Sequence, residues 1–383
     1  MRKLYLAVAC AALVGLTGSA AAATPNATRY VSTSGTDTGD CITSPCRTIG
    51  YAVAQATAGD TVSVASGTYD ESVTVTKQLS LVGSGATIDA AGFFNGIVIS
   101  GAGAAGTVVR GFTIVNANLE GLFANKTSDL KIADNTLMHN DAFGPFHPLC
   151  VTEPDDCGEA LHLQTVTGST VIGNLVQDNV GGILLTDEDG PTAGNTISGN
   201  SVVGNTLDCG ITLASHWFNF GAPVAPDVAG VYQNKILDNA SNGNGAAGIG
   251  IFAGPPGAAA WGNLVVGNTA TNNGLPGVAI HSHTAFQNAN DNVIVNNTLT
   301  GNGLDDDMRA MTRRRVSRSS PTSPQSLRRS SLPRRSHALS FLRTGSATST
   351  SESSPWARPR SRGSRATSSA RSTCPSRSTE SAT

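Results

Sequence analysis

Residues 174–190 read NLVQDNVGGILLTDEDG and contain both of the phrases that decide the fold. In the first phrase, two Asn residues five positions apart flank an aliphatic residue. It recurs as NTLMHN from Asn135, NLVQDN from Asn174, NSVVGN from Asn200, NKILDN from Asn234, NLVVGN from Asn263 and NTLTGN from Asn297. Successive copies start 39, 26, 34, 29 and 34 residues apart. Such a variable period is typical of repeats that carry insertions in their loops.

A small residue followed by alternating aliphatic residues forms the second phrase. It recurs as GIVI at Gly96, GLFA at Gly121, ALHL at Ala160, GILL at Gly182, GITL at Gly210, GIGI at Gly248 and GVAI at Gly277. Alternation with a period of two predicts strands. Because the same strand recurs once per repeat, with no hairpin partner, the pattern favours a parallel β-helix whose coils stack about 4.8 Å apart. We expect columns of inward aliphatic residues and ladders of Asn at the corners.

A short helix is predicted before the first strands. Residues 48–59 read TIGYAVAQATAG, in which Ile49, Val53 and Ala56 have helical spacing. Strand-like segments follow immediately, so we expect the helix to cover the first coil and protect its unpaired backbone edge. An ordinary α/β unit is the alternative, but no amphipathic helix follows later in the chain.

The N-terminal part of the body resembles a known family. Residues 29–41, RYVSTSGTDTGDC, and 58–92, AGDTVSVASGTYDESVTVTKQLSLVGSGATIDAAG, are similar to the opening of secreted bacterial proteins of the pectin-lyase-like superfamily. The resemblance extends over roughly residues 29–307 and implies an all-β, single-stranded right-handed parallel β-helix. The superfamily includes polysaccharide lyases, glycoside hydrolases, epimerases, phage tailspikes and adhesins, so the resemblance selects no activity.

The chain is predicted to begin with a signal peptide. Residues 1–23 carry Arg2 and Lys3, an apolar run and a series of small residues. This arrangement is typical of secretory signal peptides. No later run approaches the roughly 18 apolar residues of a membrane span. We therefore expect an extracellular protein, without a membrane span, whose β-helix domain occupies residues 24–307.

Residues 308–383 depart from the repeat abruptly. They contain 16 Arg, 22 Ser, no Lys and two acids, a net charge of +14, whereas residues 1–307 carry −16. This composition cannot bury enough apolar surface to fold, so we expect disorder. A polyanion-binding tail and a solvated linker are two interpretations; a frameshift, which replaces repeat residues by Arg and Ser, is the one we favour. The acidic body argues against nucleic acid as its partner.

The cysteines suggest local disulfides in an exported protein. Their spacing predicts that Cys41 pairs with Cys46 and that Cys150 pairs with Cys157, and it suggests no obvious partner for Cys209. The chain has no CxxC pair, which weakens a zinc or redox interpretation.

The strand register predicts which side chains face outward. Counting the small residue of each second phrase as zero, positions two and four point out. His162 lies at position two, and Thr186, Phe252 and His281 lie at position four. The insertions at residues 141–159 and 215–230 flank this surface and are predicted to form the walls of a groove.

Candidate site residues gather at this groove. In a polysaccharide lyase, His216 or His162 would take the proton next to a uronate, while Asp187 and Asp189 hold a cation such as Ca²⁺. In a hydrolase, two of the acids Asp187, Glu188, Asp189 and Asp208 would act as acid and base. The residues expected to bind the polysaccharide are Trp217, Phe218, Phe252, His281 and His283, with Phe143 and Phe146 from the other wall.

Each of these assignments has a structural alternative. The three acids that follow the strand can be its solvated exit, Trp217 can pack under its own loop, and His281 with His283 can be a metal pair or ordinary strand residues. A non-enzymatic surface or adhesion module, with the groove as a docking site, is the alternative to an enzyme. We expect a monomer.

Overall fold

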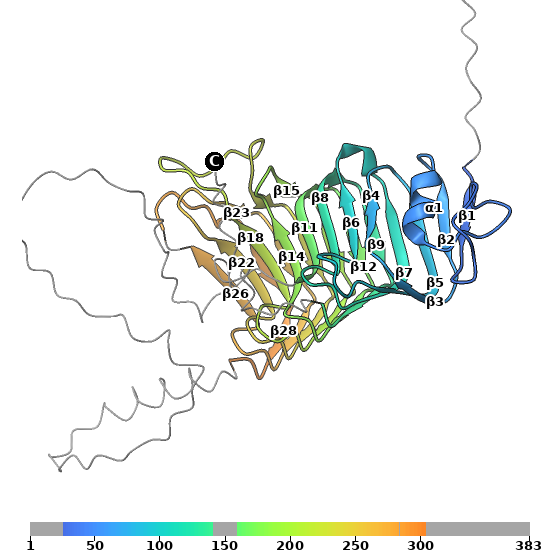
Figure 1. Cartoon of the computed structure of the whole chain (residues 1–383). Helices are drawn as coiled ribbons and strands as arrows, with labels where there is room; N and C mark the ends of the chain where they lie inside the picture. Colours follow the sequence, from blue (N-terminus) through green and yellow to red (C-terminus); the bar gives the residue numbers. More distant parts are fainter. Residues whose placement is uncertain (1–25, 141–158, 283, 304–383) are drawn as a thin grey trace, which may run out of the picture.

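The computed structural model describes residues 26–140, 159–282 and 284–303, and there the chain winds as a parallel β-helix (Figure 1). All pairings between described strands are parallel, and each joins neighbouring coils, so no hairpin occurs among them. The fold predicted from the repeats is confirmed. The predicted signal peptide, the Cys150–Cys157 pair, His283 and the tail lie outside the described residues.

Two sheets form the walls of the described stack. The larger has 17 strands: β1 (Thr28–Val31), β2 (Thr61–Val64), β3 (Gly67–Asp70), β5 (Ser80–Asp89), β7 (Val108–Val115), β9 (Lys131–Ala133), β10 (Thr136–Met138), β12 (Thr170–Ile172), β13 (Leu175–Gln177), β16 (Thr196–Ser198), β17 (Ser201–Val203), β20 (Lys235–Leu237), β21 (Ala240–Asn242), β24 (Leu264–Val266), β25 (Thr269–Thr271), β27 (Val293–Val295) and β28 (Thr298–Thr300). The smaller has 11: β4 (Val73–Val75), β6 (Ile97–Ser100), β8 (Leu122–Ser128), β11 (Glu159–Thr167), β14 (Gly181–Thr186), β15 (Thr192–Ala193), β18 (Ile211–Ser215), β19 (Val231–Tyr232), β22 (Ile249–Ala253), β23 (Ala260–Trp261) and β26 (Val278–Ser282).

Aliphatic columns fill the interior of the stack. Leu161, Ile183, Ile211 and Ile249 lie in register on consecutive coils, and all four are buried. Burying one such side chain contributes roughly 1.5–3 kcal/mol relative to leaving it exposed. Because each coil repeats the same inward positions, the columns run along the axis and hold the sheets together.

Three ladders of Asn side chains run beside these columns. In each rung, Asn Nδ2 donates to the Oδ1 of the Asn one coil further on, at 2.8–3.1 Å. The ladders are Asn135, Asn174, Asn200, Asn239, Asn268 and Asn297; Asn140, Asn179, Asn205, Asn244, Asn273 and Asn302; and Asn195, Asn234, Asn263 and Asn292.

The ladders correct the alignment of the sequence repeats. Asn200 stacks on Asn239, while Asn234 stacks on Asn195. The phrases that begin at Asn234 and Asn263 therefore lie one corner away from those that begin at Asn135, Asn174, Asn200 and Asn297. The true coil lengths along the first ladder are 39, 26, 39, 29 and 29 residues. The error arose because three equally spaced Asn per coil offer two equivalent phrases.

The predicted N-terminal helix is present as α1 (Ile49–Gln55), at the end of the stack that carries β1 and β2 (Figure 1). The Oγ1 of Thr48 accepts from the N–H of Tyr51. Glu71 accepts from the N–H groups of Ile49 and Gly50, both at 2.8 Å, so the first turn of α1 has its donors satisfied. A single 3₁₀ turn, η1 (Ala102–Ala104), follows β6.

The described cysteines are all in disulfides. Cys41 pairs with Cys46 as predicted, with 5.1 Å between the Cα atoms. Cys209 is also disulfide-bonded, which corrects the expectation that it has no obvious partner. Within the described ranges, no helix has the length and apolar character needed to cross a bilayer.

The outward face of the smaller sheet is covered in its middle coils. Positions two and four place His162, Leu184, Thr186 and Phe252 on this face, but all four are buried. A second apolar cluster forms there from Leu184, Cys209, Ala214, Ala246, Ala247, Phe252, Leu275 and Ala279. The polar side chains on this face therefore interact in a dry environment, where electrostatic contacts are strong.

Candidate functional site

The candidate site lies where two neighbouring strands of the smaller sheet end. β14 ends at Thr186 and is followed by Asp187 and Glu188, and β18 ends at Ser215 and is followed by His216. Thr186 is in register with Ala214, so the two strand exits lie one above the other. The stacking of coils thus brings together residues that are 28 or 29 positions apart in the chain.

Glu188 and His216 form a buried hydrogen-bonded pair. Glu188 Oε1 lies 2.6 Å from His216 Nδ1, and the two side chains are 3% and 0% exposed. Burial alone would raise the pKa of Glu188, but the charge and hydrogen bond of His216 hold it well below its usual range. An ionised carboxylate only accepts, so Nδ1 carries the proton. Nε2, which is buried and makes no hydrogen bond among the described residues, then presents its lone pair in the neutral ring.

Thr186 links this pair to a second histidine. Its hydroxyl donates to Glu188 Oε2, and His162 Nε2 lies 2.8 Å from the same hydroxyl oxygen. Because the one hydroxyl proton is given to Glu188, Thr186 accepts from His162. His162 Nε2 therefore carries a proton. The chain His162, Thr186, Glu188, His216 crosses three consecutive coils, and its donors converge on the Glu188 carboxylate from both sides.

Asp187 ties the two strand exits together. Its Oδ2 accepts from the hydroxyl of Ser215 at 2.7 Å and its Oδ1 from the N–H of His216 at 2.6 Å. Ser215 Oγ in turn accepts from the N–H of Ala259 at 2.8 Å. Burial raises the pKa of Asp187 to about 6, although His216 and these hydrogen bonds act in the opposite direction. Both carboxylate oxygens are thus engaged in fixing the segment that carries His216.

Asp189 lies apart from this network. Its side chain is 45% exposed and lies 3.2 Å from Lys126. Asp187 and Asp189 therefore face different partners, and the structure does not bring them to one cation, as the sequence suggested they could. The buried Asp187 and Glu188 also do not form a solvated strand exit.

The aromatic residues after β18 divide into two groups. Trp217 is half-buried against the apolar cluster of Val224, Ala229 and Ala259. Phe218 and Phe220 are 58% and 70% exposed, with ring centroids 4.7 Å apart in an edge-to-face contact. Of the predicted aromatic contacts, Phe218 is available to a ligand, and Phe220 joins it although it was not singled out from the sequence.

The other predicted binding residues lie on later coils. Phe252 is buried and meets His281 edge to face, with centroids 5.7 Å apart. His281 is half-buried. His283, Phe143 and Phe146 lie outside the described residues.

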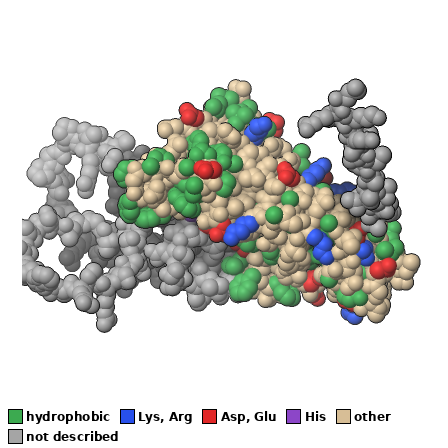
Figure 2. All heavy atoms as spheres, turned by 90° about the horizontal axis from the view of Figure 1, so that it is seen from above, with side chains coloured by type: hydrophobic (Ala, Val, Ile, Leu, Met, Phe, Trp, Pro, Cys, Tyr) green, Lys and Arg blue, Asp and Glu red, His purple; other side chains and the backbone are tan. Residues whose placement is uncertain are grey.

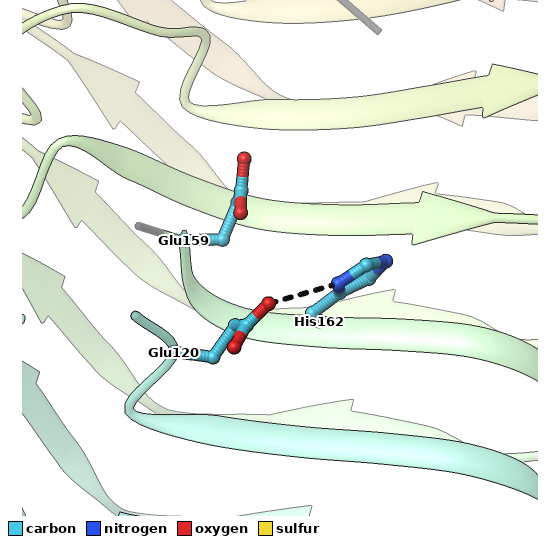
Figure 3. A group of neighbouring side chains, drawn as sticks. All are labelled: Glu120, Glu159 and His162. Atoms are coloured by element: carbon cyan, nitrogen blue, oxygen red, sulfur yellow. Dashed lines mark ion pairs between the residues drawn. The ribbon is translucent and has the colours of Figure 1, made fainter. Parts of the chain in front are cut away.

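Two further acids, Glu120 and Glu159, were missed from the sequence. Their carboxylates and His162 come together on adjacent coils (Figure 3). Both are buried, and His162 Nδ1 lies 3.5 Å from Glu120 Oε1. A signal was present, because each Glu immediately precedes the small residue of its repeat phrase, Gly121 or Ala160.

Comparison with known families agrees with this architecture. The sequence matches the model of the right handed beta helix region over residues 81–304, and the chain therefore belongs to the right-handed β-helix family. The right-handed β-helix fold that the resemblance implied is thereby confirmed. No curated protein matches the sequence.

Several solved structures share the fold at low identity. The A-module of the Azotobacter vinelandii mannuronan C-5 epimerase AlgE6 aligns over 64% of this chain and 69% of its own, with 16% identity and a TM-score of 0.43. The pectate lyase Pel9A aligns over 73% and 80%, with 12% identity and a TM-score of 0.43. A pectin methylesterase bound to a hexasaccharide aligns over 79% and 100%, with 13% identity and a TM-score of 0.37. These likenesses concern the fold alone.

Proposed function

We propose that the chain is an exported, carbohydrate-active β-helix protein that binds a uronate-containing polysaccharide and removes the proton next to the uronate carboxyl group. The observation that carries the proposal is His216, whose Nδ1 is held by Glu188 while Nε2 is buried without a hydrogen bond among the described residues. A base needs one basic nitrogen at a defined position, and a carboxylate on the other nitrogen supplies both orientation and basicity.

Proton removal fits the site better than hydrolysis does. A glycosidase needs two carboxyl groups that flank the scissile bond. Here Glu188 is bonded to Thr186 and His216, and both oxygens of Asp187 are occupied by Ser215 and His216. His216 keeps an available nitrogen, so proton transfer is the chemistry that the network favours.

Exposed aromatic residues support carbohydrate binding close to this base. Phe218 and Phe220 lie two and four residues after His216 in the chain and present two rings to solvent. Sugar rings stack on such apolar faces while their hydroxyl groups stay hydrated. On the face that Figure 2 shows, acidic and basic side chains are scattered among uncharged groups. Local contacts at the site, more than a broad field of one sign, would then select the ligand.

A carbohydrate-binding or adhesion module without turnover is the second candidate. The burial of the His216 side chain, which is 0% exposed, favours it, because a base has to reach the polymer. In that case the network of Glu188 and His216 would only hold the loop that carries Phe218.

The test separates proton transfer from binding. Protein is incubated in D₂O with polymannuronate, polygalacturonate and neutral glycans, with and without Ca²⁺. Deuterium at the uronate C5 is followed by NMR, unsaturated products by absorbance, and binding by calorimetry. We expect deuterium or unsaturated product with one uronate, at least 100-fold reduced in His216→Asn and unchanged in His139→Asn, a matched change at an exposed histidine. Binding without deuterium or product supports the module and contradicts the enzyme, and undiminished turnover in His216→Asn removes the site assignment.

A further inference from the structure

The backbone places two acidic residues directly above one another at the edge of the smaller sheet. Glu120 precedes Gly121 and β8, and Glu159 begins β11. Leu122 pairs with Leu161, so Glu120 and Glu159 occupy the same position on adjacent coils, about 4.8 Å apart along the axis. Both side chains are buried, at 4% and 2% exposure.

A break in the strand alternation turns these acids toward His162. A Cβ on Gly121 would lie 2.8 Å from Nδ2 of Asn140, which belongs to an inner ladder, so this position faces the interior. The next residue, Leu122, is also in the core. Two successive inward positions shift the acid that precedes them onto the outer face, which it shares with His162, and the donor atoms of Glu120, Glu159 and His162 all lie within 4.8 Å of one another.

The hydrogen bonding of His162 directs its lone pair into this cluster. Nε2 donates to Thr186, whose hydroxyl is committed to Glu188. In the neutral ring Nδ1 is therefore the acceptor nitrogen. It is fully buried, makes no hydrogen bond among the described residues, and lies 3.5 Å from Glu120 Oε1. An imidazole fixed in this way by a group behind it is the arrangement that metal-ligating histidines show.

The dimensions suit a small divalent cation. Bonds of about 2.0–2.1 Å in tetrahedral geometry separate ligand atoms by about 3.4 Å. The distance from His162 Nδ1 to Glu120 Oε1, 3.5 Å, is close to this value, and a Glu159 oxygen lies within 4.8 Å of both other ligand atoms (Figure 3). On the next coil the row continues with Gly181, where a Cβ would lie 3.2 Å from Glu159 Cγ, so the absent side chain leaves space beside that carboxylate.

We propose that Glu120, Glu159 and His162 bind one divalent first-row transition metal of the Zn²⁺ type, with Thr186 as the positioning residue behind His162. One imidazole nitrogen and two carboxylate oxygens match the ligands that such metals take, and a fourth position stays available. Ca²⁺ and Mg²⁺ prefer ligand sets made of oxygen alone and are expected to bind more weakly. Because the ligands are buried, we expect metal uptake to accompany folding of this region.

Direct binding of metal tests the proposal. Full-length protein is unfolded with chelator, refolded without metal, and titrated with Co²⁺ while its visible d–d absorption is recorded; the metal content of protein refolded with Zn²⁺ is measured as well. We expect one equivalent of Co²⁺ with tetrahedral bands, displacement by Zn²⁺, a raised melting temperature with Zn²⁺, and at least 10-fold weaker binding of Ca²⁺. Wild-type protein that is folded by circular dichroism and shows no Co²⁺ band and no bound Zn²⁺ would overturn the proposal.

Variants locate the metal and separate it from the proposed enzyme. Glu120→Gln, Glu159→Gln and His162→Gln should each weaken Co²⁺ binding by more than 10-fold, and Thr186→Val by about 10–100-fold. Glu71→Gln, which alters a carboxylate at the cap of α1, should bind as wild type does. His216→Asn should also bind Co²⁺ as wild type does, although it is expected to lose turnover. The metal site and the proposed base can therefore fail independently. Undiminished binding in all three ligand variants would refute the assignment.

Discussion

Replacement of Asn200 by Ala tests the ladders that hold the coils in register. The Asn200 side chain accepts from the N–H and the Nδ2 of Asn174 at 2.9 and 3.0 Å, and it donates to the carbonyl of Val171 and to Asn239 Oδ1, both at 3.0 Å. Asn174 Nδ2 keeps bonds to two other carbonyls, and Asn239 Oδ1 keeps the Asn200 N–H. The Asn174 N–H loses its partner, whereas the Val171 carbonyl stays within the pairing of β12 with β16, and the Ser198 carbonyl, to which Asn200 also donates, keeps the N–H of Gly173.

The magnitude follows from this one buried N–H group. A buried donor that loses its partner costs roughly 1–3 kcal/mol, so we expect Asn200→Ala to lower the free energy of unfolding by roughly 1–3 kcal/mol. The matched control is Asn219→Ala, which deletes the same atoms from an exposed residue with one side-chain hydrogen bond, to the carbonyl of Ala222. We expect about 0.5 kcal/mol or less for this change.

Urea unfolding followed by far-ultraviolet circular dichroism measures both variants. Coils of a solenoid interact with their immediate neighbours, so the slope with urea concentration is compared as well as the midpoint, to show whether the stack still unfolds as one unit. If the free energies of unfolding of Asn200→Ala and Asn219→Ala differ by less than about 0.5 kcal/mol, the ladders do not stabilise the fold as described.

Three further predictions concern the core and the buried acids. Leu213 lies in a fully buried column, so Leu213→Ala should lower the free energy of unfolding by about 2–5 kcal/mol, as measured by urea unfolding. Leu299 is 47% exposed on the last described coil, so Leu299→Ala should lower it by far less. Burial would raise the pKa of Asp60, but hydrogen bonds from Thr57, Ala27 and Arg29 lower it to about 2. The contribution of ionised Asp60 to the free energy of unfolding is therefore complete above about pH 4 and is lost as the pH falls toward 2. We expect Asp60→Asn to lower the free energy of unfolding by about 3 kcal/mol at pH 7. If the difference in stability between this variant and wild type does not shrink between about pH 4 and 2, the pairing of Asp60 with Arg29 is contradicted. The pKa of Asp187 is raised to about 6, so the free energy of unfolding of the wild type should fall as the pH rises from 4 to 6. The stability of Asp187→Asn relative to wild type should therefore increase by about 2–3 kcal/mol over that range. The same dependence of stability on pH in both proteins would exclude the raised pKa.

The architecture could be predicted because a repeat states the same physical requirement many times. An inward aliphatic residue must recur on every coil, and Ile183 and Ile211 do so in register, as the alternation of their phrases indicated. The alignment of individual coils was less certain, because Asn195, Asn200 and Asn205 are equally spaced and any two of them fit one phrase. Only the hydrogen bonds along the axis show which corner each Asn occupies.

The candidate site was predicted in part for a related reason. Stacking of strand exits brought Asp187 next to His216, as expected from their places on adjacent coils. Glu188 holds His216, whereas Asp189 faces solvent, and neighbouring acids on a turn give no sequence signal for this choice. Glu120 was missed because strict alternation assigns it to the interior, and the two successive inward residues that follow it become visible only in the structure.

The protonation of His216 is the most direct test of the proposed base. Selective ¹⁵N labelling of histidine, with His216→Asn to assign its signals, reports by NMR which ring nitrogen carries the proton in the neutral ring. The geometry predicts a proton on Nδ1, hydrogen-bonded to Glu188, and an unprotonated Nε2, with this preference weakened in Glu188→Gln. A neutral His216 that carries its proton on Nε2 in the wild-type protein would contradict the account.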